Sequence, residues 1–149
     1  MKIQTKYVGE ITIDESTIIK FSKGIPGFLN ETEFVLLELP GNPLFHILQS
    51  IQTRDIAFIL TDPYHFYRNY SFELDDNTLE TLAIKSENDV LVLSVVTLQQ
   101  PFANSTINLK APIIINPNSK YGKQYILNID EYPSKASILT EEKTELKGE

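Results

Sequence analysis

Most of this chain consists of short runs of strand-forming residues, each ended by a cluster of turn-forming residues. The opening stretch at residues 2–7 alternates polar and apolar side chains, Gly9 interrupts it, and Ile11 and Ile13 resume the period of two. Further runs lie at 17–21, 34–39, 44–50, 56–61, 90–98, 106–109, 113–116 and 123–128. Glycine, proline, asparagine or aspartate separates nearly all of them, so none extends into a long helix. The spacing is typical of an antiparallel barrel or sandwich.

The stretch NSTINLKAPIIINPNSKYGKQYIL, residues 104–127, shows the pattern most clearly. Isoleucines occupy positions 113–115, and β-branched side chains lose less freedom in a strand than in a helix. Pro112 and Pro117 exclude a helix from either side. Turn-forming residues follow up to Gly122, and strand-forming residues then return. We therefore expect a buried strand that opens a β-hairpin.

One segment has helical spacing instead. Leu74, Thr78 and Leu82 lie four residues apart, and Asp75 or Asp76 is a suitable N-cap. The next run, VLVLSVVTL at 90–98, is apolar on both faces and is expected either in the centre of the sheet or beneath the helix. The predicted fold is mainly β, an antiparallel β-barrel-like structure with one short helix near residues 75–84.

The chain has 149 residues, about the length of one domain, and we assign residues 1–133 to it. The remaining segment at 134–149, SKASILTEEKTELKGE, is mostly polar and charged. Its few apolar residues are Ala136, Ile138, Leu139 and Leu146. These are too few to fold alone, so we expect a flexible, charged C-terminal tail. The tail is either an inert solubilising segment or one whose Ile138, Leu139 and Leu146 order against a partner.

Composition excludes several classes of function. The chain has no cysteine, and therefore no disulfide, thiolate nucleophile or cysteine-ligated zinc. Its N-terminus lacks the apolar run of a signal peptide, and no stretch approaches 18 apolar residues, so we expect a cytoplasmic protein with no membrane partner. The net charge of −7 argues against direct nucleic-acid binding and favours a basic partner.

No catalytic or metal-binding signature is present. His46 and His65 are the only histidines and lack the spacing of a metal-ligand pair, so we expect no metal, no cofactor and no catalytic residue. The glycines of KGIPGF at 23–28 are expected to serve a turn. The aromatic segment DPYHFY at 62–67 is either a recognition patch or a plug for one end of a barrel.

Acidic residues are densest between positions 71 and 100, where six acids accompany one lysine and give a net charge of −5. Five of these acids are candidate partner-binding residues: Asp75, Asp76, Glu80, Glu87 and Asp89. The sixth acid is Glu73, and the lysine is Lys85. The region is either a solvated helix face or a docking face that attracts a basic partner.

Several segments together resemble the FliW family of flagellar assembly factors, over nearly all of residues 1–133. They are MKIQTKYVGEITIDESTIIKFSKGIPGF, FVLLEL, FHILQS, IAFILTDPY, NSTINLKAPIIIN and KYGKQYIL. KGIPGF, DPY and NLKAPIIIN are the most specific of them and occur in the expected order. The resemblance implies a small cytoplasmic β-barrel-like protein without enzymatic activity. It also makes Asn108 and Lys110, within NLKAPIIIN, candidate exposed contacts for a partner.

The resemblance further implies two protein partners, flagellin and the carbon storage regulator CsrA, a small basic dimer that represses flagellin translation. Flagellin that accumulates occupies the family protein and leaves CsrA free to repress, whereas export of flagellin reverses this. A different class of function stays open at this point. A barrel mouth with a small-ligand or enzyme site would use His46 or His65 with Asp62 as acid–base groups. A packed barrel interior would weigh against that alternative.

Overall fold

The computed structural model describes residues 1–139. The strands are β1 (Lys2–Gln4), β2 (Glu10–Thr12), β3 (Ile19–Lys20), β4 (Glu33–Leu39), β5 (Asn42–Ser50), β6 (Ala57–Thr61), β7 (Leu91–Thr97), β8 (Thr106–Ile107), β9 (Ile113–Asn116), β10 (Tyr121–Gln124) and β11 (Ala136–Ser137). The helices are α1 (Pro63–Phe66) and α2 (Asp76–Thr81), with single 3-10 turns η1 (Glu15–Thr17), η2 (Glu87–Asp89) and η3 (Phe102–Asn104). The predicted mainly β architecture is confirmed.

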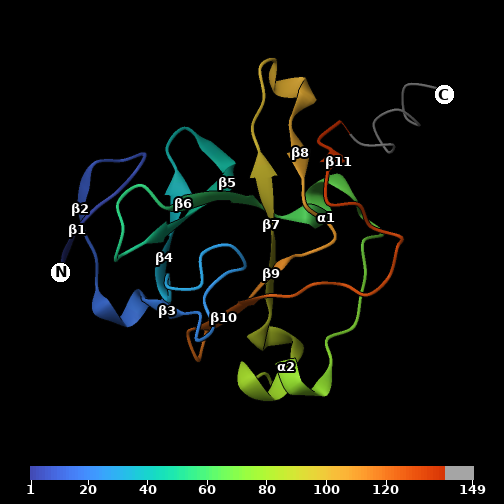
Figure 1. Cartoon of the computed structure of the whole chain (residues 1–149), viewed down its shortest axis with the longest axis horizontal. Helices are drawn as coiled ribbons and strands as arrows, with labels where there is room; N and C mark the ends of the chain where they lie inside the picture. Colours follow the sequence, from blue (N-terminus) through green and yellow to red (C-terminus); the bar gives the residue numbers. More distant parts are fainter. Residues whose placement is uncertain (140–149) are drawn as a thin grey trace.

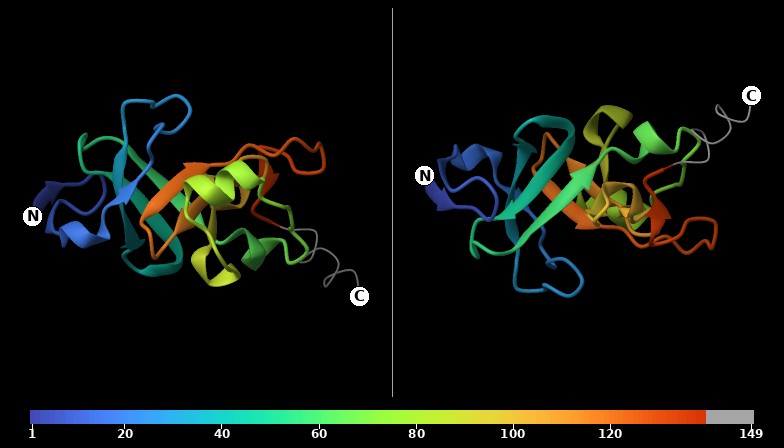
Figure 2. Two further views of the ribbon diagram at one scale, coloured as in Figure 1. Left: turned by 90° about the horizontal axis from the view of Figure 1, so that it is seen from below. Right: turned by 90° about the horizontal axis from the view of Figure 1, so that it is seen from above.

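Nine strands form one sheet in the order β11-β8-β7-β6-β5-β4-β3-β10-β9. An additional pairing between β7 and β9 closes the strands from β7 round to β9 into a barrel-like ring, and β8 and β11 continue beyond β7. β7 therefore lies at the centre of the molecule, as its two apolar faces predicted (Figure 1). The strands β1 and β2 form a separate hairpin at one end, opposite the segment that follows β10 (Figure 2).

The sheet is antiparallel, as predicted, except at one position. β10 runs parallel to β3, through the pair Tyr121 and Lys20, and the N–H of Lys20 donates to the carbonyl of Lys120 over 2.8 Å. The other ladders of the described sheet are antiparallel. Strands so far apart in sequence have no short turn to fix their direction. The β9–β10 hairpin expected from residues 104–127 is present.

Apolar side chains fill the space inside the ring. They come from β3, β4, β5, β6, β7 and β9 and from the loop after β3: Ile19, Phe21, Ile25, Phe34, Leu48, Leu60, Leu93, Ile113 and Ile115. Phe21 and Phe34 meet edge to face with ring centroids 5.2 Å apart. Because these side chains are buried against one another, the ring encloses a packed core. This packing weighs against a ligand site in the barrel interior.

A second core covers the outer face of β5, β6 and β7. Its buried members are Phe45, Ile47, Ile59, Tyr70, Val96, Ile107, Leu109, Leu127, Ala136 and Ile138. The hydroxyl of Tyr70 donates to the carbonyl of Leu109 over 2.7 Å, and burial raises the pKa of that hydroxyl, so it stays a donor at neutral pH. This contact holds the segment after α1 against the sheet.

Residues 134–139 differ from the prediction of a tail that begins at residue 134. β11 pairs with β8 through Ala136 and Ile107, and the N–H of Ile138 donates to the carbonyl of Ser105 over 3.0 Å. Ile138 is 2% exposed. The burial of Ala136 and Ile138 against β8 stabilises this segment, which is too polar to fold alone. The rest of the predicted tail, with Leu146, lies outside the described residues.

The turn at KGIPGF depends on glycine, as expected. Gly24 has φ +69°, and a Cβ atom there would lie 2.5 Å from the backbone oxygen of Leu29. We expect Gly24→Ala to lower the free energy of unfolding by more than about 1 kcal/mol, because it adds a backbone clash to the positive-φ strain. Gly27→Ala is the matched control, since φ is +88° there and no atom lies within 4 Å of the added Cβ. Equal melting temperatures for the two variants in circular dichroism would contradict the clash.

Candidate functional site

The predicted acidic region folds into α2 and η2, and Figure 1 shows α2 at one end of the molecule. Asp75 is the N-cap of α2, and its carboxylate accepts the N–H of Thr78 over 2.8 Å. The hydrogen bonds from Thr78 hold the pKa of Asp75 below its usual value. The charged form is therefore the capping form, and its stabilising effect is lost only as the pH falls through that lowered pKa.

Asp89 is also engaged within the fold. Its carboxylate accepts the N–H of Lys85 over 3.0 Å and the side-chain amide of Asn118 over 2.7 Å. These bonds, with the Lys85 N–H as the larger cause, lower the pKa of Asp89. Nearby, the side-chain amide of Asn116 donates to the carbonyl of Leu82 over 2.8 Å. α2 and η2 are thus fastened to the turn between β9 and β10.

Asp76, Glu80 and Glu87 have a different environment. All three are exposed, and none makes a side-chain hydrogen bond or ion pair with another residue in 1–139. The five predicted acids therefore divide into two that hold the local structure and three that are free to meet a partner. The arrangement concentrates negative charge on two elements that hydrogen bonds fasten to the rest of the fold.

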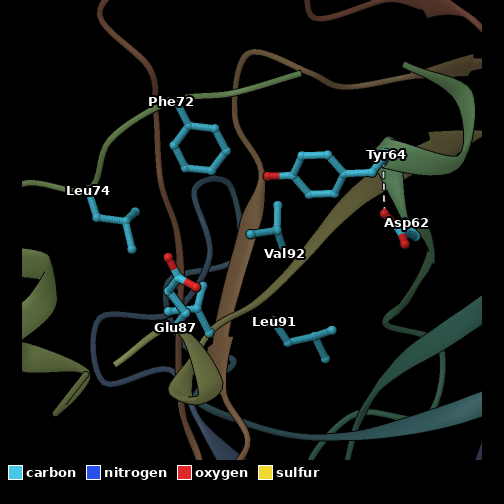
Figure 3. A pocket seen from close by; sticks show the side chains of 8 residues that line it. Asp62, Tyr64, Phe72, Leu74, Glu87, Leu91 and Val92 are labelled. Atoms are coloured by element: carbon cyan, nitrogen blue, oxygen red, sulfur yellow. Dashed lines mark hydrogen bonds between the residues drawn. The ribbon is translucent and has the colours of Figure 1, made fainter. Parts of the chain in front are cut away.

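A pocket of about 520 Å³ lies beside the acidic region and against β7. It is lined by Asp62, Tyr64, Phe72, Leu74, Glu87, Val90, Leu91 and Val92. Figure 3 shows Val92 at its centre, with Phe72 and Leu74 on one side and the Tyr64 hydroxyl directed into it from the other. Burial raises the pKa of that hydroxyl, and the Asp62 carboxylate adds to the effect, so the phenol keeps its proton.

Both sides of this pocket are held by hydrogen bonds. On the Tyr64 side, Asp62 caps α1 by accepting the N–H of Tyr64 over 2.8 Å. On the Phe72 side, the N–H of Ser71 donates to the Tyr132 hydroxyl over 3.1 Å, and the N–H of Asp75 donates to the Tyr125 hydroxyl over 3.1 Å. The extended chain that carries Phe72 and Leu74 is therefore fixed at both ends. The pocket is a formed feature of the free protein.

Sequence reasoning missed this pocket. Three separate segments build it, at 62–64, 72–74 and 87–92, and their proximity depends on how β6, β7 and η2 pack. The aromatic segment DPYHFY was the available signal, because Tyr64 lines the pocket while Phe66 and Tyr67 pack on the outer core. The helix α1 begins in this segment, capped by Asp62 with Pro63 at the first helical position.

The other predicted contact residues lie apart from the acidic face. Asn108 is half-buried and accepts the N–H of Ala111 over 3.0 Å, and Lys110 lies 4.0 Å from the carboxylate of Asp130. Ile138 belongs to the outer core, whereas Leu139 is 51% exposed. Leu146 lies outside the described residues. The structure thus does not gather the nine candidate residues that lie within 1–139 into one site.

The alternative acid–base site is not assembled. His46 lies in β5 opposite Glu38 and Leu60, His65 packs its ring against Phe66, and neither lines the pocket that contains Asp62. Within residues 1–139, no cluster of three or more histidine, aspartate or glutamate side chains is placed to hold a metal ion. Of the helices in this same range, none has the length and apolar character needed to cross a membrane.

Comparison with known proteins gives a consistent result. Residues 2–138 match the family model described as FliW protein. The flagellar assembly factor FliW of Oceanobacillus iheyensis is 54% identical over 138 residues, which is 93% of this chain and 94% of that protein. The factor of the same name from Bacillus velezensis is 48% identical over 93% of this chain and 96% of its own length. A crystal structure of the flagellar assembly factor FliW superposes with a TM-score of 0.89 at 46% identity, covering 93% of this chain and 96% of that one.

Proposed function

Because this chain belongs to the FliW family of flagellar assembly factors, we propose that it acts in the cytoplasm by binding two proteins, flagellin and the translational regulator CsrA. The family consists of assembly factors and not of enzymes, which agrees with the packed ring and the separated histidines. In the proposed cycle, the chain sequesters CsrA when flagellin has been exported, and flagellin translation proceeds. Accumulated flagellin occupies the chain instead, CsrA is released, and translation stops.

The acidic face on α2 and η2 is the observation that carries the CsrA half of this proposal. Residues 71–100 contribute −5 to a net charge of −7, so the negative field is concentrated on one part of the chain. A basic dimer approaching such a face associates faster and in a preferred orientation. Asp76, Glu80 and Glu87 supply the contacts, because their carboxylates have no partner within residues 1–139. Asp75 and Asp89 hold α2 and η2 in place through their hydrogen bonds.

The double variant Asp76→Asn/Glu80→Lys tests this assignment. We expect it to weaken CsrA binding about tenfold, a difference of about 1.4 kcal/mol, because it removes three units of negative charge from the face. The control Glu38→Gln/Glu15→Lys makes the same charge change on exposed residues of β4 and η1 and should bind within about twofold of the parent. Titration calorimetry at about 50 and about 500 mM salt measures both, and the parent should lose affinity at high salt as screening increases.

Two results would contradict the proposed electrostatic docking. The first is equal weakening by the two double variants, which would show a dependence on net charge without a defined face. The second is a parent affinity that does not change with salt. Melting temperatures complete the comparison: Asp75→Ala should melt below the parent, because it removes the α2 cap, whereas the face variant should melt near it. The flagellin half is tested by asking whether prior flagellin binding prevents CsrA capture.

Asn108, Lys110, Leu139 and Leu146 are kept as proposed contacts of secondary importance. Lys110 lies 4.0 Å from the exposed Asp130, and Asn108 is two residues from Lys110 in the chain, so both suit a second partner surface better than the acidic face on α2 and η2. Ile138 is a weaker candidate than Leu139, because it packs in the outer core and has little surface left for a partner. The division into a β-barrel-like unit at residues 1–133 and a charged segment at 134–149 stays a prediction.

A further inference from the structure

We propose that the pocket beside β7 binds one short extended peptide segment of a partner, which pairs with the free edge of β7 and carries alternating apolar and basic side chains. The proposal adds a binding mode to the function proposed above and rests on that function only for the identity of the partner. It depends on three features of the pocket: an unpaired strand edge, apolar walls, and carboxylates without counter-charges.

The strand edge follows from the hydrogen-bond pattern of β7. The N–H of Asn108 donates to the carbonyl of Val95 over 2.9 Å, so Val95 bonds toward β8. Antiparallel strands alternate the direction of bonding at each residue, which directs Ser94 and Val92 toward β6. β6 ends opposite Ser94, at Thr61.

Val92 is consequently left without a ladder partner on the β6 side. The residue that would oppose it is Pro63, which begins α1 and has no N–H to donate. The backbone hydrogen bonds of residues 1–139 outside the ladders include none from or to Val92. Val92 instead lines the pocket, at its centre (Figure 3). An extended segment laid in the pocket would supply the missing donor and acceptor, as in strand addition to an exposed sheet edge.

The walls suit such a segment. Phe72, Leu74 and Val90, which all line the pocket, offer apolar contact to alternate side chains, because successive residues of a strand point to opposite faces. The Tyr64 hydroxyl points into the space and has no hydrogen-bond partner within residues 1–139, so it is available to a backbone carbonyl of the occupant. The fixed chain at 71–75 keeps this space open in the free protein.

Charge selects the occupant. Asp62 and Glu87 are the charged residues that line the pocket. The neighbouring chain adds Glu73, Asp75 and Asp76, and of these Asp75 also feels the positive charge of Lys123. A segment that carries lysine or arginine besides its apolar residues complements the negative charge around the pocket, whereas an acidic segment is repelled by it. The chain's own residues 140–149 contain four glutamates and two lysines, so they match the pocket poorly.

A fluorescein-labelled synthetic peptide that alternates lysine with valine is a suitable probe for the full-length chain. Fluorescence anisotropy should show saturable binding, and the same peptide with glutamate in place of lysine should bind at least about tenfold more weakly. Glu87→Lys should weaken the lysine peptide about five- to tenfold, whereas Glu15→Lys, an equal change on η1, should leave it within about twofold. Tyr64→Phe should weaken it less than Glu87→Lys does.

Backbone pairing has its own test, since only one edge of the peptide faces β7. Two further peptides carry N-methyl groups on the amides of either the lysines or the valines, and one of them should lose binding about tenfold while the other keeps it. Equal loss with both would overturn the pairing, as would unchanged binding to Glu87→Lys. Much tighter binding to a chain ending at Leu139 would show that the tail already occupies the pocket, against the proposal. Because the probe contains no partner protein, CsrA or flagellin binding can fail or succeed independently of it.

Discussion

Replacement of Ile114 by aspartate is expected to lower the free energy of unfolding by about 3–5 kcal/mol, the range found when a buried charge is left unpaired. Ile114 has no exposed surface and lies in β9, where it is paired with Val92 of β7 on one side and with Lys123 of β10 on the other. Its neighbours Ile113 and Ile115 point into the ring, so Ile114 points to the outside of it. Asn116, two residues on, faces the same way and bonds to the end of α2.

The control is the same substitution at an exposed isoleucine. Ile126 is 55% exposed and follows β10, so Ile126→Asp adds a charge that stays in water and should shift the melting temperature little. Denaturant unfolding followed by circular dichroism measures both variants. If Ile114→Asp unfolded at the same denaturant concentration as the parent, Ile114 would have to be accessible to water, and the closure of the ring between β7 and β9 would be wrong.

The local pattern predicted the individual strands well and the closure of the ring poorly. The hairpin of β9 and β10 could be predicted because two prolines, a run of isoleucines and a turn cluster lie next to one another in the sequence. The pairing of β9 with β7 and the parallel pairing of β10 with β3 join segments with no connecting turn, so nothing local specifies them. The apolar character of both faces of VLVLSVVTL was the one sign in the sequence that β7 is central.

The candidate site divides in the same way. The charge of the acidic region could be read from the sequence, and the capping role of Asp75 follows from its place before the apolar spacing of α2. The role of Asp89 depends on Asn118, which lies 29 residues away in the chain. The Asn118 amide can donate to the Asp89 carboxylate only because the turn between β9 and β10 lies beside η2. The unpaired edge at Val92 likewise depends on where β6 ends relative to β7. Contacts and free edges that arise only when separate elements pack together give no periodic pattern in the sequence.

The C-terminal segment shows how composition can mislead. A stretch with so few apolar residues cannot fold alone, and this argument holds for the isolated segment. It fails for residues 134–139 because β8 offers a ready strand edge and the outer core offers a place for the Ile138 side chain. A two-residue strand needs no independent stability when its partner is already in place.

A chain that ends at Pro133 is therefore expected to be strongly destabilised, while one that ends at Leu139 keeps every contact described for this segment. The shorter chain loses the burial of Ala136 and Ile138 and the hydrogen bond from the N–H of Ile138 to Ser105. It also loses the bond that the Tyr67 hydroxyl donates to the carbonyl of Ser137. Removing a buried side chain the size of isoleucine costs about 2–5 kcal/mol, and each hydrogen bond adds about 1 kcal/mol.

Since a domain of this size has only about 5–15 kcal/mol of stability, the loss should be visible as a large drop in melting temperature, or as unfolding at ambient temperature. Urea unfolding of the two truncated chains and the parent gives the comparison. The chain ending at Leu139 should unfold with the parent, and the chain ending at Pro133 well before it. Coincident transitions for all three would show that β11 contributes nothing to the fold. In that case Ile138 and Leu139 would be available to contact a partner. The burial of Ile138 against β8 is the reason that it has little surface for such a contact.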